Sequence, residues 1–346
     1  MTLFLRPTIY RNKVNFHKFH QYSTKSNTLK KLRIQKFIIT GSTLFATGSI
    51  FYFFINNDDT YKSFASFSLI PVKSTISSDK FTATPIHQII PQSKTTSIFR
   101  LKLSAPLQEP FPVSSCVHVK DPSLQIMREY TPISPIVKND ELLYIDLLVK
   151  RYENGQVSRY IHGLSVGDLM EIRGPVITFQ YRENMYKALG MICGGTGITP
   201  MYQIIKHILN TPSDKTKISL IYANQSIDEI LLRKELDILS KKHPDQFKVY
   251  YTIDNAPSSS SWNQGIGYIT SEMIKQNMPP PSSSSLSNID DKNSNKDDDN
   301  SILILVCGPD GLMKSISGRR ARDMSQGRLR GLLKKLGYNE NQVFKF

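Results

Sequence analysis

The stretch ALGMICGGTGITPM, residues 188–201, decides the fold of this chain. Its first six residues have the apolar character of a buried strand, three glycines follow, and MYQIIKHILN (201–210) has the apolar spacing of a helix. Glycines at the carboxyl end of a strand let a ligand approach the backbone, and the next helix offers free N–H groups to an anion. The stretch therefore predicts a ligand-binding turn at the edge of a parallel sheet.

Downstream, strand-like and helical segments alternate to the end of the chain. The expected strands are ISLIYAN (218–224), FKVYYTID (247–254) and SILILVCG (301–308). The expected helices are DEILLRKELDILSKK (228–242), SEMIKQN (271–277) and a last one near 329–336. This alternation predicts a doubly wound α/β domain with a parallel sheet over 183–346. Residues 282–300 are rich in Ser, Asn and Asp, which predicts a disordered insertion.

Upstream, residues 81–182 have an all-β pattern. Short segments rich in β-branched and aromatic residues are separated by Pro and Gly, namely TTSIFRLKLS (95–104), SSCVHVK (114–120), LLYIDLLVKRY (142–152) and DLMEIRGP (168–175). Strands of this length and spacing predict a closed antiparallel barrel or a sandwich.

Three further motifs carry chemistry. In REYTPIS (128–134), an extended backbone would place Arg128, Tyr130 and Pro132 on one face of a strand. NGQVSRYI (154–161) offers a glycine and a hydroxyl for contact with a pyrophosphate. CGPDGLM (307–313) follows a strand, where a doubly wound sheet presents groups to its ligand.

Taken together and in this order, these motifs resemble the NADH–cytochrome b5 reductases, within the ferredoxin reductase-like flavoproteins. The resemblance covers about residues 81–346, including ANQSIDEILLRKEL (223–236) and the terminal VFKF (343–346). It implies an FAD-binding antiparallel β-barrel followed by an NADH-binding α/β domain, with the flavin between them.

The resemblance assigns the flavin side of the site to the barrel. Arg128 would pair with the FAD phosphates, Tyr130 would lie along the flavin, and Thr131 would approach its N5 edge. The residues implied to line the cofactor or hold its pyrophosphate are Lys150, Tyr152, Gly155, Gln156, Val157 and Ser158.

The resemblance assigns the nicotinamide side to the second domain. Cys307 and Gly308 would set the nicotinamide beside the flavin, and Asp254 would repel a 2′-phosphate and so favour NADH over NADPH. The turn and the threonine near the flavin are Gly194, Gly195, Thr196, Gly197 and Thr199. Thr131 and Cys307 are the implied catalytic residues, and the hydride would pass between the cofactors without a protein nucleophile.

The chain departs from the reductase pattern at four places. Glu129 stands where those reductases usually have Pro, Cys193 stands where a small apolar residue is commoner, and no counterpart of their upstream histidine occurs around 104–110. The residues after CGPDG form a longer ending. That ending, with the N-terminal segments described next, resembles more closely the fungal mitochondrial flavoproteins that support haem attachment to cytochrome c.

The N-terminus has the pattern of a targeting segment followed by a membrane-spanning segment. Residues 1–36 hold nine Lys and Arg and no Asp or Glu, which is typical of a mitochondrial transit peptide. Residues 37–55 carry no charge and are long enough to cross a bilayer as a helix. Basic residues before this span and Asp58 and Asp59 after it predict a single-pass protein of the mitochondrial inner membrane. The domains, joined to the span by a linker over 56–80, would then face the intermembrane space.

The charge and cysteine patterns exclude some classes. The net charge of +15 comes mostly from the N-terminal segment, so the sequence predicts no nucleic-acid partner. The spacing of Cys116, Cys193 and Cys307 suits neither a metal site nor a disulfide framework.

The expected electron acceptor is haem or a haem protein of the cytochrome c maturation machinery. A general NADH–cytochrome b5 or quinone reductase and a non-catalytic assembly factor stay open as alternatives. A basic cluster (Lys314, Arg319, Arg320, Arg322, Arg328, Arg330) could steer haem propionates or an acidic partner, or could be a solvated loop face.

Overall fold

The computed structural model describes residues 76–103, 111–133, 143–255, 262–281 and 302–346. All of these belong to one compact unit, Pro71–Phe346. The predicted transit peptide, the predicted membrane span, most of the linker and the predicted insertion lie outside the described residues. Among the helices of the described ranges, none has the length and apolar character needed to cross a membrane.

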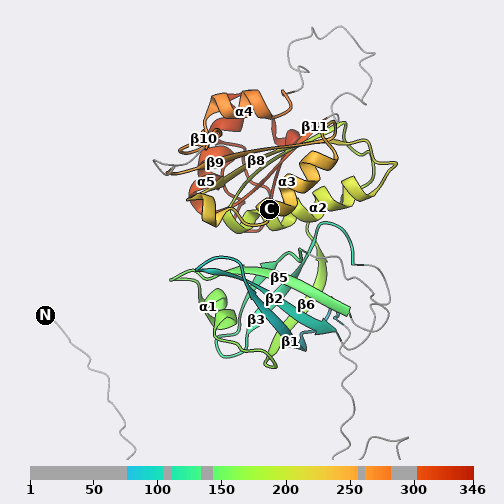
Figure 1. Cartoon of the computed structure of the whole chain (residues 1–346), viewed down its shortest axis with the longest axis vertical. Coiled ribbons are helices and arrows are strands. Elements are labelled where there is room, and N and C mark those ends of the chain that lie inside the picture. The colour runs from blue at the N-terminus through green and yellow to red at the C-terminus, as the bar shows by residue number, and fades with distance from the viewer. Residues whose placement is uncertain (1–75, 104–110, 134–142, 256–261, 282–301) are drawn as a thin grey trace, which may run out of the picture. The chain divides into compact units, whose positions relative to one another are not determined.

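The first part of the unit is antiparallel, as the strand pattern predicts (Figure 1). Its strands are β1 Thr82–Pro91, β2 Thr96–Leu103, β3 Ser115–Asp121, β4 Ile126–Tyr130, β5 Leu143–Lys150 and β6 Leu169–Ile177, in the order β4-β3-β6-β1-β2-β5. A bridge between Pro132 and Leu147 joins the chain after β4 to β5, so the two outer strands meet and the sheet closes into a barrel.

Alternation of side chains fills the barrel. Phe99, Leu101 and Leu103 of β2 point inward and are almost fully buried, and they pack with Ile145 and Leu147 of β5. A short helix, α1 Gln156–His162, follows β5, and its buried residues join the same core. This packing fixes where β5 ends and α1 begins, which positions one side of the functional site.

The second part is a parallel sheet with helices on both faces, as predicted. Its strands are β7 Ala188–Gly194, β8 Lys217–Asn224, β9 Phe247–Ile253, β10 Gly265–Ile266, β11 Ile302–Cys307 and β12 Val343–Lys345, in the order β10-β9-β8-β7-β11-β12. The helices are α2 Ile198–Asn210, α3 Arg233–Lys242, α4 Ser271–Asn277, α5 Asp310–Ile316 and α6 Gly331–Lys335.

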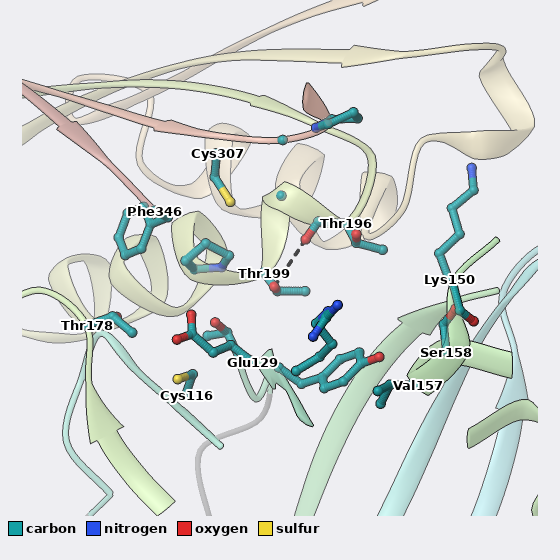
Figure 2. Close-up of a pocket in the computed structure, with 18 of the residues that line it drawn as sticks. Cys116, Glu129, Lys150, Val157, Ser158, Thr178, Thr196, Thr199, Cys307 and Phe346 are labelled. Carbon is teal, nitrogen blue, oxygen red and sulfur yellow. Dashed lines mark hydrogen bonds between the residues drawn. The ribbon is translucent and has the colours of Figure 1, made fainter. Parts of the chain in front are cut away.

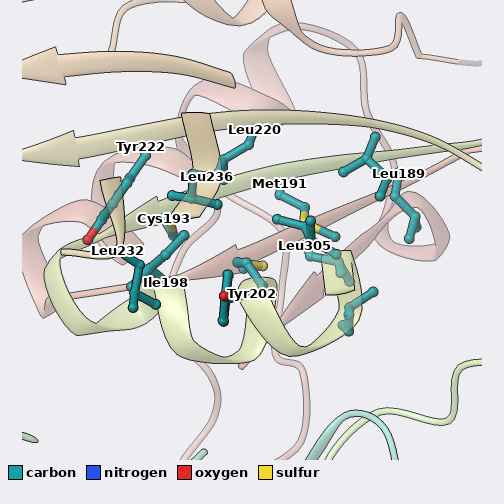
Figure 3. Packing of buried hydrophobic residues seen from close by; sticks show 14 of the residues in the cluster. Leu189, Met191, Cys193, Ile198, Tyr202, Leu220, Tyr222, Leu232, Leu236 and Leu305 are labelled. Carbon is teal, nitrogen blue, oxygen red and sulfur yellow. The ribbon is translucent and has the colours of Figure 1, made fainter. Parts of the chain in front are cut away.

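Successive residues of the central strands enter opposite cores, because neighbouring side chains of a strand point to opposite faces. Met191 and Leu305 pack with α2 and α3, and Figure 3 shows this layer around Ile198, Tyr202 and Leu236. The residues adjacent to these in the same strands, Ile192 and Ile304, point to the other face and pack with α4, α5 and α6. Burial on both faces explains why these strands are continuous apolar runs in the sequence.

One helix begins later than the sequence predicts. The expected helix from Asp228 starts at Arg233, because Leu232 adopts a left-handed conformation with φ 56°. A short 3₁₀ turn, Ile227–Glu229, precedes it. Leu231 and Leu232 are buried, so tertiary packing overrides the helical spacing at this point. The irregular segment places Glu229 where it contacts the barrel, as described below.

Candidate active site

A cleft of about 900 Å³ opens between the ends of the barrel strands and the carboxyl edge of the parallel sheet (Figure 2). Its lining comes from β4, from β5 and the start of α1, from the end of β6, from the turn after β7, from the loop after β11 and from the chain terminus. A pocket of this size is large enough for a cofactor. The carboxyl edge of a doubly wound sheet is also where such folds bind their ligands.

The glycine turn after β7 is built for close approach of backbones. A Cβ on Gly197 would lie 2.4 Å from the carbonyl oxygen of Cys307, so no larger residue fits there. Gly195 has φ +54°, a conformation that favours glycine, and its carbonyl oxygen accepts a hydrogen bond of 2.9 Å from the Tyr222 hydroxyl. The Thr199 hydroxyl donates to the carbonyl oxygen of Thr196 at 3.1 Å. The close approach at Gly197 puts the turn directly against the loop that follows β11, and the two hydrogen bonds fix the shape of the turn.

The corresponding element on the barrel side is the start of α1. A Cβ on Gly155 would lie 2.4 Å from the Ser158 hydroxyl oxygen and 2.9 Å from Cβ of Tyr152. The Ser158 hydroxyl donates to the carbonyl oxygen of Gly155 at 3.0 Å and accepts from the Tyr152 N–H at 3.2 Å. Among the residues that the structure describes, no side chain caps this helix N-terminus, so its first N–H groups are available to an anion.

Polar contacts join the two sides of the cleft. The Lys150 ammonium forms an ion pair of 2.8 Å with Glu229, and the Tyr152 hydroxyl lies 3.3 Å from the Thr196 hydroxyl. The Gln203 amide of α2 accepts from the Ser115 N–H at 3.0 Å and donates to the Ser115 carbonyl oxygen at 3.3 Å. Lys150 therefore lines the cleft with its charge already paired, and Gln203 is a connecting residue that sequence reasoning missed.

Glu129, where the chain departs from the reductase pattern, has a partner in the next strand. His118 of β3 is opposite Glu129 of β4, and the imidazole Nε2 lies 3.6 Å from the carboxylate. The Arg173 guanidinium lies 3.4 Å from the other ring nitrogen of His118. The carboxylate is therefore held at the cleft wall by a histidine and, behind it, an arginine.

Two cleft thiols stay protonated at neutral pH. Burial and, second, the nearby Glu129 carboxylate together raise the pKa of the Cys116 thiol to about 12. Burial and then Glu129 likewise raise the pKa of the Cys307 thiol to about 12. Cys193, opposite Cys307 in the β7–β11 ladder, has its pKa raised well above the usual value by burial. Cys307 can thus contribute shape and polarisability to the site, and it does not supply a thiolate.

These pKa shifts predict slow alkylation. At pH 8 we expect Cys116 and Cys307 of the native chain to react with iodoacetamide on the order of 10³-fold slower than an ordinary thiol, because only the thiolate is nucleophilic. Unfolding in urea removes the burial and should restore normal reactivity. Peptide mass spectrometry after timed labelling measures both rates, and rapid labelling of native Cys307 would contradict the assignment.

The structure brings most of the predicted site residues together. Those that line the cleft are Arg128, Tyr130, Thr131, Lys150, Tyr152, Gly155, Gln156, Val157, Ser158, Gly194, Thr196, Gly197, Thr199, Cys307 and Gly308. Gly195 shapes the turn but is not among the residues that line the cleft. Asp254 also lies outside the cleft, directly after β9, where its N–H donates to the Asn224 carbonyl oxygen at 3.0 Å. Arg128 and Glu129 both line the cleft although they are consecutive residues of β4.

Sequence reasoning missed other lining residues. They are Cys116, Ile126, Leu148, Asn154, Val176, Ile177, Thr178, Pro309, Arg320, Met324, Phe344 and Phe346. Two more are Glu129, where the chain departs from the reductase pattern, and Pro200, in the first turn of α2. The strand β12 pairs in parallel with β11, which carries the end of the chain to the carboxyl edge of the sheet. That pairing was the missing signal for Phe346, which Figure 2 shows near Cys307.

A barrel and a parallel sheet that share one cleft define the class of two-domain flavin- and pyridine-nucleotide-dependent reductases. Residues 84–181 match the model of the oxidoreductase FAD-binding domain, and residues 191–318 match that of the oxidoreductase NAD-binding domain. An Arabidopsis thaliana NADH-cytochrome b5 reductase-like protein is 38% identical over 318 residues, which cover 89% of each chain. The chain belongs to the NADH–cytochrome b5 reductase-like family of flavoproteins.

Other relatives agree with this assignment. The NADH-cytochrome b5 reductase 2 of Coccidioides immitis is 41% identical over 220 residues, 64% of this chain and 61% of that protein. The cytochrome b5 reductase domain of Ulva prolifera nitrate reductase superposes with a TM-score of 0.61 and 28% identity, over 78% of this chain and 99% of that one. The CS-b5R domains of human Ncb5or share the fold, with a TM-score of 0.57, 22% identity and coverage of 84% and 77%.

The chain is accordingly an NADH-dependent FAD oxidoreductase. The cleft fits these two cofactors. The start of α1 beside Gly155, which no side chain of the described residues caps, suits an anionic pyrophosphate, and the glycine turn after β7 lets a ligand approach the backbone. Bound together, the cofactors supply hydride transfer from nicotinamide to flavin. The residues that line the cleft would orient them, and Cys116 and Cys307, with their raised pKa values, would offer no ionised thiol that could compete.

Proposed function

We propose that this reductase passes electrons from NADH to haem iron. The observation that supports this proposal is the cleft with its two facing cofactor-binding elements in a chain whose relatives are named NADH-cytochrome b5 reductases. A flavin that accepts a hydride must release electrons singly to a one-electron acceptor, and haem iron is such an acceptor.

Two haem acceptors follow from different features. A cytochrome b5-type haem protein is favoured by the names of the relatives. A haem that is to be attached to cytochrome c is favoured by the longer ending, whose residues 314–335 hold eight Lys and Arg and one acidic residue, Asp323. Most of those basic side chains are exposed, and a positive surface attracts haem propionates. Within this proposal, the second acceptor gives the chain a role in haem attachment.

The location is part of the same proposal. The acid-free basic segment over 1–36 and the uncharged segment over 37–55 support import into mitochondria and anchoring in the inner membrane. The charge difference across residues 37–55 supports domains that face the intermembrane space. Carbonate extraction and protease protection of mitochondria and mitoplasts test this placement, and digestion of the domains only after the inner membrane is opened would overturn it.

The acceptor is tested by reoxidation. The full-length chain in detergent is reduced anaerobically with NADH and then mixed in a stopped-flow instrument with ferric haem, cytochrome b5 or a short-chain quinone. We expect reoxidation by haem iron to be faster than by quinone. Fast reoxidation by cytochrome b5 with none by free haem would select the first acceptor and exclude the role in haem attachment. Reoxidation by quinone alone would overturn both.

A further inference from the structure

The end of the chain is fastened by a lysine that the cofactor chemistry does not use. Lys345 of β12 is 1% exposed, and its ammonium donates to the carbonyl oxygens of Gln326 at 2.5 Å, Arg328 at 3.1 Å and Gly327 at 3.2 Å. The carbonyl oxygen of Arg319 lies at 3.5 Å. An ammonium has three N–H donors, so this cage satisfies it completely.

The cage is reinforced by a second set of hydrogen bonds. The Gln326 side chain accepts from the Lys345 N–H at 2.6 Å and donates to the Lys345 carbonyl oxygen at 3.1 Å. The loop Gly318–Arg330 is thus bound to both the side chain and the main chain of one residue. Within the described residues Lys345 forms no ion pair, and burial lowers its pKa.

A buried charge without a carboxylate costs desolvation energy, which carbonyl dipoles offset only in part. An apolar side chain at position 345 would avoid that cost but would leave three carbonyl oxygens without their donor. The cage therefore holds the loop at a defined position against β12. The alternation of side chains along β12 shows which residues the Lys345 cage positions.

Val343 and Lys345 point to one face of β12, and Phe344 and Phe346 point to the other. Val343 packs into the core formed with α4, α5 and α6, on the side away from the cleft. Phe344 and Phe346 point the other way and line the cleft, with ring centroids 5.1 Å apart. Fixing Lys345 therefore fixes the direction of both rings.

The loop that forms the cage also reaches the cleft. Arg320 and Met324 belong to its lining, and the Arg320 guanidinium donates to the Met324 carbonyl oxygen at 3.1 and 2.5 Å through two of its nitrogens. The two phenylalanines and this turn are therefore held together through Lys345. All four line the cleft, and Phe346 lies near Cys307 (Figure 2).

We propose that Lys345 and Gln326 form a lock that positions the Phe344, Phe346, Arg320 and Met324 wall of the cleft, and that this wall sets the affinity for NADH. Lys345 acts through its neighbours and is a positioning residue. The lock concerns the NADH half of the reaction and does not depend on which haem acceptor is proposed.

The test replaces the ammonium by an unbranched apolar side chain. In the full chain in detergent, Lys345→Met should raise KM for NADH about tenfold with ferricyanide as acceptor, because the wall loses its fixed position. It should also change the visible circular dichroism of the bound flavin, while the FAD content per chain stays that of the wild type. Lys275→Met, at an exposed lysine of α4 that lies outside the cleft lining and the basic ending, is the matched control and should change none of these. Equal values for Lys345→Met and Lys275→Met would overturn the proposal.

A double-variant cycle shows whether the lock acts through the aromatic end. Removal of Phe346 should raise KM for NADH as well, and Lys345→Met combined with it should add little, because the two changes act on one wall. Additive effects would show independent roles and overturn the proposal. If Lys345→Met does not fold, Gln326→Ala carries the same test, since it removes the two bonds to the Lys345 main chain and leaves the ammonium in place.

Discussion

Gly197→Ala is expected to lower kcat/KM for NADH by about a hundredfold or more, because displacement of a reacting group by about 1 Å can cost that much. A Cβ on residue 197 would lie 2.4 Å from the oxygen and 2.7 Å from the carbon of the Cys307 carbonyl, and 3.0 Å from Cα of Gly308. All three are backbone atoms, so the glycine turn and the loop after β11 must separate. These two loops are the elements predicted to place the nicotinamide.

The measurement is steady-state reduction of ferricyanide over a range of NADH concentrations. The FAD content should stay close to that of the wild type, because the start of α1, which is predicted to bind FAD, is on the barrel. Gly311→Ala is the matched control, since no atom of the described ranges lies within 4 Å of a Cβ there and alanine favours the helix α5. A Gly197→Ala enzyme with kcat/KM near that of Gly311→Ala would show that the contact between the loops does not matter for catalysis.

Gly155→Val should yield a chain that is purified largely without FAD, with the dissociation constant for FAD raised by about 10²-fold or more, which corresponds to about 2.8 kcal/mol. The new side chain would meet the Ser158 hydroxyl and Cβ of Tyr152, at 2.4 and 2.9 Å from its Cβ alone. Its methyl groups would also occupy space at the uncapped N-terminus of α1, where the anionic pyrophosphate is predicted to bind.

Flavin released by denaturation, measured per mole of chain, reports this loss. Gly163→Ala, at the other end of α1, is the control, because its nearest neighbour is one carbonyl oxygen at 3.3 Å. We expect that variant to retain FAD. Full flavin occupancy in Gly155→Val, with unchanged affinity, would contradict the predicted role of this turn.

The sequence predicted those parts of the site that depend on local structure. The turn at 194–197 follows an apolar strand and contains a position that only glycine can occupy, Gly197, where a Cβ would lie 2.4 Å from the Cys307 carbonyl oxygen. The two-domain order could likewise be predicted, since the spacing of apolar residues changes near residue 183. The family resemblance then identified the barrel residues expected to bind FAD, and the structure places most of them in one cleft.

The parts that escaped prediction depend on contacts between distant segments. Phe346 enters the cleft because β12 pairs with β11, a register that no local pattern contains. Lys345 has the appearance of a surface lysine in the sequence, yet it is buried by a loop about twenty residues earlier in the chain. The late start of α3 has the same origin, since burial of Leu232 outweighs the helical spacing of its sequence.

The most direct test of the account is an anaerobic titration of the purified full-length chain with NADH, followed by the visible absorbance of the flavin. The account predicts a yellow protein that carries FAD and loses its flavin absorbance as NADH is added, with much weaker response to NADPH. A colourless protein that retains no flavin, or bound FAD that NADH does not bleach, would contradict it.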